Sequence, residues 1–373
     1  MLGLRRRSAR RRSQRRPTDG SVLERVPRSS PSAERSSVVR IVVPAPRGSE
    51  PRNAWLIPGP PLVLVDPGPA TDAAYAAVRD AMAALSLGLH DIRRIVLTHA
   101  HGGHAGLTAR IQADSGARIL AHPDALPALA DPSAAAAQRV ERALRAAGAA
   151  GMPADLAASS ADEWRARLAA ELAEEPLGVS PSACAALADG EPLDPHVDDP
   201  EGMLSWSAHH TGGHSADHLV LVHTQRATAI TGDLIDRRRS TIADIVPTGP
   251  GGVRAPQLAR LVEAWRILAR RPVNLWLPGH GEPIRAPRVL IARRLAESRL
   301  ALQSVRHVLS AEPLTAWEVC TRRGMAGGAH DAGRALTATI ALLDWLVARG
   351  HAARTVSDGA WRFVRTERRG RGR

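Results

Sequence analysis

Cysteine is scarce in this sequence: Cys184 and Cys320 are the only two among 373 residues. Two cysteines are too few for a disulfide framework, so we expect a reducing compartment, the cytoplasm. Long apolar runs are also missing: no apolar stretch approaches the roughly 20 residues that a membrane span needs. The basic N-terminal segment lacks the apolar stretch of a secretory signal. We therefore expect neither a membrane span nor export.

Lysine is absent altogether, and the formal net charge of +13 rests on arginine. Residues 1–40 hold 12 Arg against three acidic residues, and residues 365–373 hold five Arg against one Glu, so the two ends carry the whole excess. Contacts of such ends with nucleic acid would be unspecific. We predict a disordered, Arg-rich leader over residues 1–37 and a basic tail over residues 367–373.

From about residue 38, short apolar runs alternate with helical patterns. The runs "PLVLVDPG" and "IRRIVLTHAH" are typical of strands, and "TDAAYAAVRDAMAALSL" between them has helical spacing. α/β folds place their chemistry in polar clusters at the carboxyl ends of such strands. Between Asp131 and Glu201 the chain is rich in Ala and carries 14 acidic residues against five Arg. This pattern predicts an acidic helical insertion over about residues 125–200.

The C-terminal part reads as three helices followed by two strands around a turn. This order is typical of a winged helix, which we predict over residues 288–366. The last helix, "ALTATIALLDWLVARG", carries few cations, with Arg334 before it, Arg349 at its end and Asp344 between them. A DNA recognition helix normally presents several cationic or amide side chains. We therefore favour a packing or channel-lining role over DNA binding.

Five separated stretches place potential metal ligands directly after apolar strands. They contain Asp66 in "LVDPG", His99, His101 and His104 in "THAHGGH", His214 and His218 in "TGGHSADH", Asp233 in "TGDL", and His280 in "PGHG". Imidazole nitrogens and carboxylate oxygens hold zinc or iron without thiolates. A single histidine after a strand is usually structural, but five such stretches in one chain indicate a metal site.

The order and spacing of these motifs resemble the metallo-β-lactamase superfamily over roughly residues 38–290. The family signature is Thr-His-x-His-x-Asp-His, followed by a histidine turn, Gly-Asp and Pro-Gly-His-Gly. The resemblance implies an α/β fold, an αββα sandwich over residues 38–287, with the metal site at one edge and a winged helix after it. It also implies that Asn53 and Asp66 support the metal-binding loops.

The resemblance further assigns the ligands. His99, His101 and His214 would hold the first metal ion, His104 and His280 the second, and Asp233 would bridge the two. Gly103 stands where the family has an Asp that binds the second ion, so we predict one Zn²⁺ and a second site that is weak or empty. Gly212 and Gly213 replace the usual Pro-Gly, which should loosen the loop that presents His214.

The chemistry implied is hydrolysis. Bound Zn²⁺ lowers the pKa of its water to about 7 and polarises a carbonyl or phosphoryl oxygen of the substrate. Asp233 would position the hydroxide. His218 is the second candidate catalytic residue, either stabilising an oxyanion or, as we favour, orienting a ligand. The run Arg237, Arg238 and Arg239 would either clamp an anionic substrate or form a solvated loop, and the sequence leaves both open.

We predict a cytoplasmic metal-dependent hydrolase of a small ester, thioester, lactone or phosphoester. Three alternatives stay open. The first is a mononuclear dioxygenase of sulfur compounds, with Fe²⁺ on His99, His214 and Asp233. The second is a nuclease, which the acidic insertion and the neutral body disfavour. The third is a non-catalytic member of the family that acts by binding.

Overall fold

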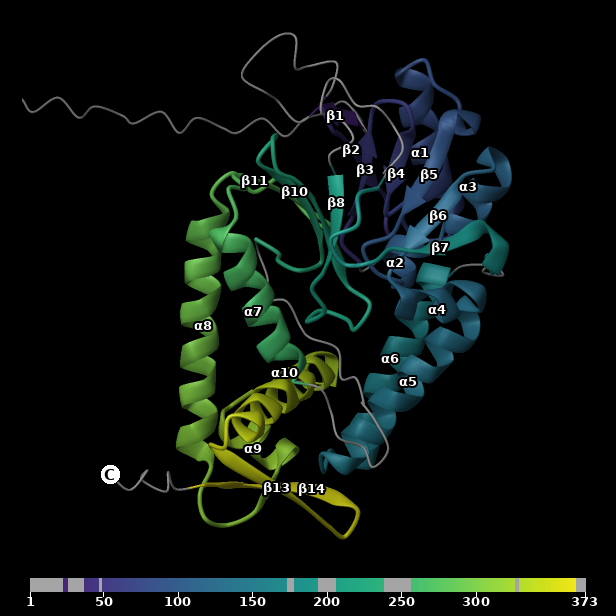
Figure 1. Ribbon diagram of the computed structural model, residues 1–373. Helices are drawn as coiled ribbons and strands as arrows, with labels where there is room; N and C mark the ends of the chain where they lie inside the picture. The colour runs from purple at the N-terminus through teal and green to yellow at the C-terminus, as the bar shows by residue number, and fades with distance from the viewer. Residues whose placement is uncertain are drawn as a thin grey trace, which may run out of the picture.

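The structure is a computed structural model that describes residues 23–25, 37–46, 49–172, 178–193, 206–237, 256–325 and 329–366. Within these ranges, two β-sheets face each other and helices cover their outer faces (Figure 1). The arrangement is the α/β sandwich that the sequence predicted.

The strands of the described residues form three sheets. The first sheet contains, in order, β1 (Leu23–Arg25), β2 (Val39–Val43), β3 (Arg52–Ile57), β4 (Leu62–Val65), β5 (Ile92–Val96), β6 (Arg118–Ala121) and β7 (Cys184–Ala186). The second contains β11 (Leu275–Pro278), β10 (Thr228–Gly232), β9 (Leu219–His223) and β8 (Trp206–His210). The third contains β12 (Leu314–Thr315), β14 (Ala360–Arg365) and β13 (Ala352–Ser357). Strands β4 to β7 run parallel, and so do β10 and β11, so their carboxyl ends lie at common sheet edges.

The helices fall into three groups. The first sheet is accompanied by α1 (Asp72–Ala84), η2 (Leu89–Asp91), α2 (Gly102–Ala105) and α3 (Thr108–Ser115). The insertion contains η3 (Pro123–Ala125), α4 (Leu126–Ala130), α5 (Pro132–Ala149), α6 (Ala154–Leu172) and η4 (Pro181–Ala183). The second half contains α7 (Gln257–Arg270), α8 (Pro287–Val308), α9 (Ala316–Arg322) and α10 (Ala329–Ala348).

Strand β4 shows how the sequence divides the core. Successive side chains of a strand point to opposite faces of its sheet. Leu62 and Leu64 therefore join the cluster under α1 and α3, whereas Val63 and Val65 pack between the two sheets with Trp206 of β8. An unbroken apolar run is what a strand buried on both faces requires.

One described segment within the predicted helical insertion belongs to a sheet. We expected the insertion over about residues 125–200, but β7 pairs in parallel with β6 and belongs to the first sheet. The helices α4, α5 and α6 lie within the predicted range. The sequence did not predict β7, because the Ala-rich stretch around Cys184 has no alternating strand pattern.

The insertion packs against the C-terminal elements rather than standing apart from them. Ala147 and Met152 share one apolar cluster with Leu309 and Phe363. The backbone N–H of Trp317 also donates to the carbonyl of Ala150 over 2.9 Å. Together these elements lie below the two sheets in Figure 1. The order α8, β12, α9, α10, β13 and β14 follows the expected three helices and hairpin. Its assignment as a winged helix stays a prediction.

The predicted leader contains one described strand. β1 pairs antiparallel with β2, which differs from the disorder expected over residues 1–37. The rest of residues 1–36 and the basic tail at residues 367–373 lie outside the described residues. Among the described helices, none combines the length and the apolar character that a membrane crossing requires.

Candidate metal centre

The strand ends bring the predicted ligands together between the two sheets. His99 follows β5, Asp233 follows β10 and His280 follows β11, while His214 lies in the loop between β8 and β9. His104 lies on α2, the short helix that begins directly after His101. Residues from widely separated parts of the chain therefore form one polar cluster.

Three imidazoles form the first potential ligand group. The candidate ligand atoms of His99, His101 and His214 lie within 4.8 Å of one another, and His101 Nδ1 lies 3.1 Å from His214 Nε2. His99 is fully buried, and its Nε2 has no hydrogen-bond partner among the described residues. A buried, unsatisfied nitrogen beside two further imidazoles fits a metal ion.

Asp233 occupies the centre of the cluster. Its Oδ2 lies 3.4 Å from Nε2 of His104, 3.7 Å from Nε2 of His214 and 3.6 Å from Nε2 of His280. Burial raises the pKa of this carboxyl, but His104 and His280 outweigh burial and hold the pKa well below its usual value. An ionised carboxylate that faces all three rings is placed as a bridging ligand would be.

A chain of hydrogen bonds fixes the ring of His99. The Thr98 hydroxyl donates to Asp66 Oδ2 over 2.7 Å and lies 3.0 Å from His99 Nδ1. Its oxygen can then accept the Nδ1 proton, which leaves the lone pair of Nε2 free for a metal ion. Burial and the neighbouring histidines lower the pKa of His99 well below its usual value, so the ring is neutral, as a ligand must be.

Asn53 and Asp66 support the metal-binding loops, as the resemblance implied. Asn53 Nδ2 donates to the carbonyls of Pro278 and Gly281 over 2.8 and 2.7 Å, on either side of His280. Asp66 Oδ1 accepts from the backbone N–H of Thr98 over 2.8 Å. Each residue holds the chain beside one ligand.

Asp217 is a supporting residue that the sequence analysis missed. Its Oδ2 accepts from Ala100 N–H over 2.7 Å, and Ala100 is the residue between His99 and His101. The one available signal was its position directly before His218 in "HSADH". A carboxylate that fixes this peptide fixes the spacing of two ligands.

His218 lies behind the ligands rather than in the open part of the site. Its side chain is fully buried, its Nδ1 lies 2.9 Å from Thr211 Oγ1, and its ring centroid lies 5.3 Å from that of His99. Burial and the neighbouring His214 lower the pKa of His218 well below its usual value. Which of the two roles this residue has stays a prediction.

Gly213 is packed tightly although its loop carries two glycines. Its φ is +89°, and a Cβ there would lie 2.6 Å from the Cα of Leu261 on α7. Gly213 N–H also donates to Gln257 Oε1 over 3.2 Å. The helix therefore holds the loop that we expected to be loosened.

Gly103 faces a buried arginine. A Cβ at Gly103 would lie 2.7 Å from Nη2 and 2.8 Å from Nε of Arg52. The place where the family carries the second-site carboxylate is thus next to a guanidinium.

Arg237 is exposed and lines a groove, whereas Arg238 and Arg239 lie outside the described residues. The groove has a volume of about 580 Å³ and is also lined by Arg285, just before α8, and by Arg293 on α8. Glu282 and Pro283, directly after the turn that carries His280, form part of its wall.

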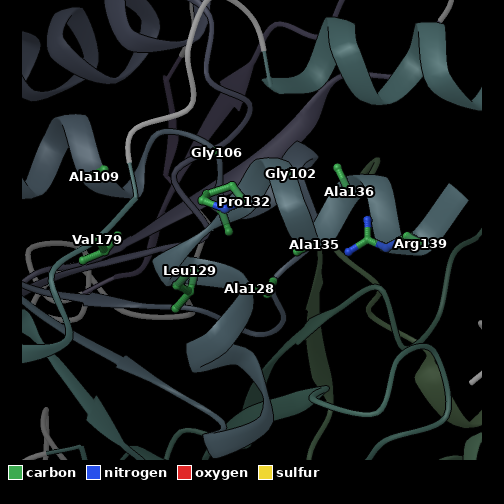
Figure 2. A pocket seen from close by; sticks show the side chains of 12 residues that line it. Gly102, Gly106, Ala109, Ala128, Leu129, Pro132, Ala135, Ala136, Arg139 and Val179 are labelled. Atoms are coloured by element: carbon green, nitrogen blue, oxygen red, sulfur yellow. The ribbon is translucent and has the colours of Figure 1, made fainter. Parts of the chain in front are cut away.

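A smaller pocket lies behind α2, against α4 and α5 (Figure 2). Ala and Gly residues such as Ala100, Gly102 and Ala135 line it, and Arg139 is the one charged side chain among the described residues around it. It is an apolar gap between α2 and the insertion helices, and it contains no ligand atoms of the candidate metal centre.

Residues 47–280 match the family model described as the metallo-beta-lactamase superfamily. The match covers more than half of the chain, and the chain belongs to this superfamily. This confirms the family resemblance that the motifs carried.

A curated relative and two solved structures agree with this membership. The chain is 28% identical over 283 residues to the "Probable metallo-hydrolase YqjP" of Bacillus subtilis (strain 168), covering 76% of this chain and 83% of the relative. It shares the fold of the metallo-beta-lactamase family protein TTHA1429 from Thermus thermophilus, with a TM-score of 0.65, 22% identity, and coverage of 88% and 98% of the two chains. It also shares the fold of a beta-lactamase domain protein from Burkholderia ambifaria, with a TM-score of 0.63 and 22% identity. That match covers 88% of this chain and 92% of the other.

Proposed function

We propose that the protein is a metal-dependent hydrolase that uses one firmly held divalent ion, Zn²⁺ by the chemistry of its ligands. The observation that carries the proposal is the cluster of His99, His101 and His214, with the carboxylate of Asp233 3.7 Å from His214 Nε2. Three imidazoles and one carboxylate suit Zn²⁺ and leave room for an exchangeable position. The alternative with Fe²⁺ uses His99, His214 and Asp233 and gives no role to His101, although His101 Nδ1 lies 3.1 Å from His214 Nε2.

The residues around the site have separable tasks. A bound metal ion would lower the pKa of a coordinated water to about 7 and polarise a substrate oxygen. Asp233 Oδ2 lies among the rings of His104, His214 and His280, where it could accept from an attacking water. Thr98 and Asp217 hold the His99 loop, and Asn53 holds the His280 turn, so the ligands are positioned before substrate arrives.

The groove beside the site favours a small anionic substrate. Arg237, Arg285 and Arg293 line it, and guanidinium groups bind carboxylates and phosphates with two parallel hydrogen bonds. An ester, thioester, lactone or phosphoester with an anionic group would place that group in the groove and its scissile bond near Asp233.

A nucleic-acid substrate is less well supported. Helix α10, the candidate recognition helix, packs against α6, α7, α8 and α9, and Leu336, Ile340 and Leu343 on it are buried. A helix enclosed in this way contributes to packing. The reducing compartment remains part of the proposal, and Cys184 and Cys320 are both free thiols.

The test is turnover by purified protein with and without a chelator. The substrate panel contains a p-nitrophenyl ester, a thioester, a lactone and bis(p-nitrophenyl) phosphate. We expect metal-dependent turnover of at least one class, lost in Asp233→Asn and retained in the control Asp80→Asn, an exposed carboxylate on α1.

Three results would contradict the proposal. Turnover that persists after chelation or in Asp233→Asn would show that the reaction does not use the metal site. Bound iron with oxygen uptake on a sulfur compound would favour the dioxygenase. No turnover of any class by the metal-loaded protein would favour the binding alternative.

A further inference from the structure

The space for a side chain at position 103 is already taken. The nearest atoms to a Cβ at Gly103 are Nη2, Nε and Cζ of Arg52, at 2.7, 2.8 and 3.1 Å. Contacts below 3 Å between a Cβ and another heavy atom require something to move. A Cβ at position 103 would therefore require the guanidinium of Arg52 to move from its present place.

Arg52 is anchored where it lies. It is the first residue of β3, pairs with Val43 of β2, and is only 7% exposed. Its Nη1 donates to the carbonyl of Glu50 over 2.6 Å. The adjacent Pro51 carbonyl lies 3.1 Å from His280 Nδ1. The same short segment thus positions both the guanidinium and one of the two histidines assigned to the second metal ion.

The charge of Arg52 acts on this side of the site. Its guanidinium lies against the position of Gly103, and Gly103 directly precedes His104 on α2, the other histidine assigned to the second metal ion. Relative to the family pattern, this side has lost a carboxylate, and the guanidinium of Arg52, which stays charged at all ordinary pH values, lies against the position of that loss. The loss makes the local charge more positive by one unit, the charge of Arg52 lies beside it, and like charges repel a second cation.

We propose that Arg52 replaces the second metal ion: its guanidinium fills the space opened by Gly103 and supplies the fixed positive charge beside His280, so the chain binds a single ion. The two positions act as a pair, because glycine makes room for the arginine and the arginine excludes the ion. The role of Arg52 concerns the same site as the proposed hydrolase, but it depends only on how many metal ions the site binds.

A set of four proteins tests the pair. Each is loaded with Zn²⁺, freed of excess by gel filtration, and analysed for metal per chain by elemental mass spectrometry. We expect one ion in the wild type, one in Gly103→Asp, and two in Arg52→Ala/Gly103→Asp. The matched control is Arg110→Ala/Gly103→Asp, which removes an exposed arginine on α3 and should stay at one ion.

The outcome for Gly103→Asp alone is the sharpest. From the sequence, restoring the carboxylate should raise the metal content to two, whereas the structure places Arg52 ready to pair with the new carboxylate. Two ions in Gly103→Asp or in the wild type would overturn the proposal, and so would one ion in a folded Arg52→Ala/Gly103→Asp. If that double variant does not fold, Arg52→Gln/Gly103→Asp replaces it, because glutamine keeps much of the bulk and removes the charge. Two ions in this variant would support the proposal, and one ion would overturn it.

Metal content separates this proposal from the proposed function. A protein with one ion and no hydrolysis contradicts the hydrolase and leaves the role of Arg52 standing. A protein with two ions and metal-dependent hydrolysis contradicts the role of Arg52 and leaves the hydrolase standing.

Discussion

Replacing Gly213 by alanine should damage the site through backbone geometry alone. The φ of Gly213 is +89°, and the added Cβ would lie 2.6 Å from Cα and 2.7 Å from N of Leu261. Both are backbone atoms of α7, which a side-chain rotation cannot move. The loop would have to shift away from the helix, and His214, the next residue, would shift with it.

Gly212 is the matched control because it shares the loop and the left-handed backbone. Its φ is +56°, but the nearest atom to an added Cβ is Arg260 Cδ at 3.7 Å, an ordinary contact. A left-handed alanine costs about 1–2 kcal/mol, and overpacking costs about 1–3 kcal/mol more. We therefore expect a loss of about 1–2 kcal/mol for Gly212→Ala and about 2–5 kcal/mol for Gly213→Ala.

The assay is urea unfolding of the chelated proteins, followed by zinc affinity against a competing chelator. Gly213→Ala should lower the free energy of unfolding more than Gly212→Ala and weaken zinc binding by roughly 10- to 100-fold, as changes to residues that orient a ligand do. Equal losses of stability in the two variants would refute the argument from the contact with α7.

Two further predictions concern polar groups beside the ligands. Asp217→Ala removes the acceptor of Ala100 N–H and should cost about 1.5–3 kcal/mol of stability and roughly 10- to 100-fold in zinc affinity. Asp217→Asn, which keeps an acceptor, should lie between it and the wild type, and unchanged zinc affinity in the alanine variant would contradict the role. The pKa of His218 is held well below its usual value by burial and by His214, so below about pH 6.5 the unfolded chain takes up a proton that folded His218 does not. This group should therefore lower the stability of the chelated protein as the pH falls, by up to about 1.4 kcal/mol per pH unit, and His218→Asn should show a shallower dependence in urea unfolding between pH 7.5 and 5. Identical slopes would show that His218 does not titrate in this way.

The sequence singled out the residues of this cluster because each belongs to a local pattern. An apolar strand that ends in a histidine or an aspartate is visible within ten residues, and the order of such patterns identified the fold. Strand β7 lacks this signal, because Cys184–Ala186 is short and lies in an Ala-rich stretch whose composition favours a helix. It forms a strand because it pairs with β6, a contact that the sequence of the segment alone does not reveal.

Arg52 and Asp217 could not be predicted for a related reason. Nothing in the sequence around Arg52 relates it to Gly103, and only the folded sheet brings the guanidinium against that glycine. Asp217 contacts Ala100, which is more than a hundred residues away in the chain. From the sequence, Gly103 was a lost ligand, whereas in the structure it is one half of a packed pair.

The number of metal ions bound by the wild-type chain tests the central claim most directly. Metal-free protein is titrated with Zn²⁺ in the presence of a competing chelator, and the bound metal is counted by elemental mass spectrometry. One ion per chain, with no second ion at higher Zn²⁺ concentrations, is the predicted result. Two firmly bound ions would contradict the role of Arg52, and a chain that binds none would contradict the metal centre itself.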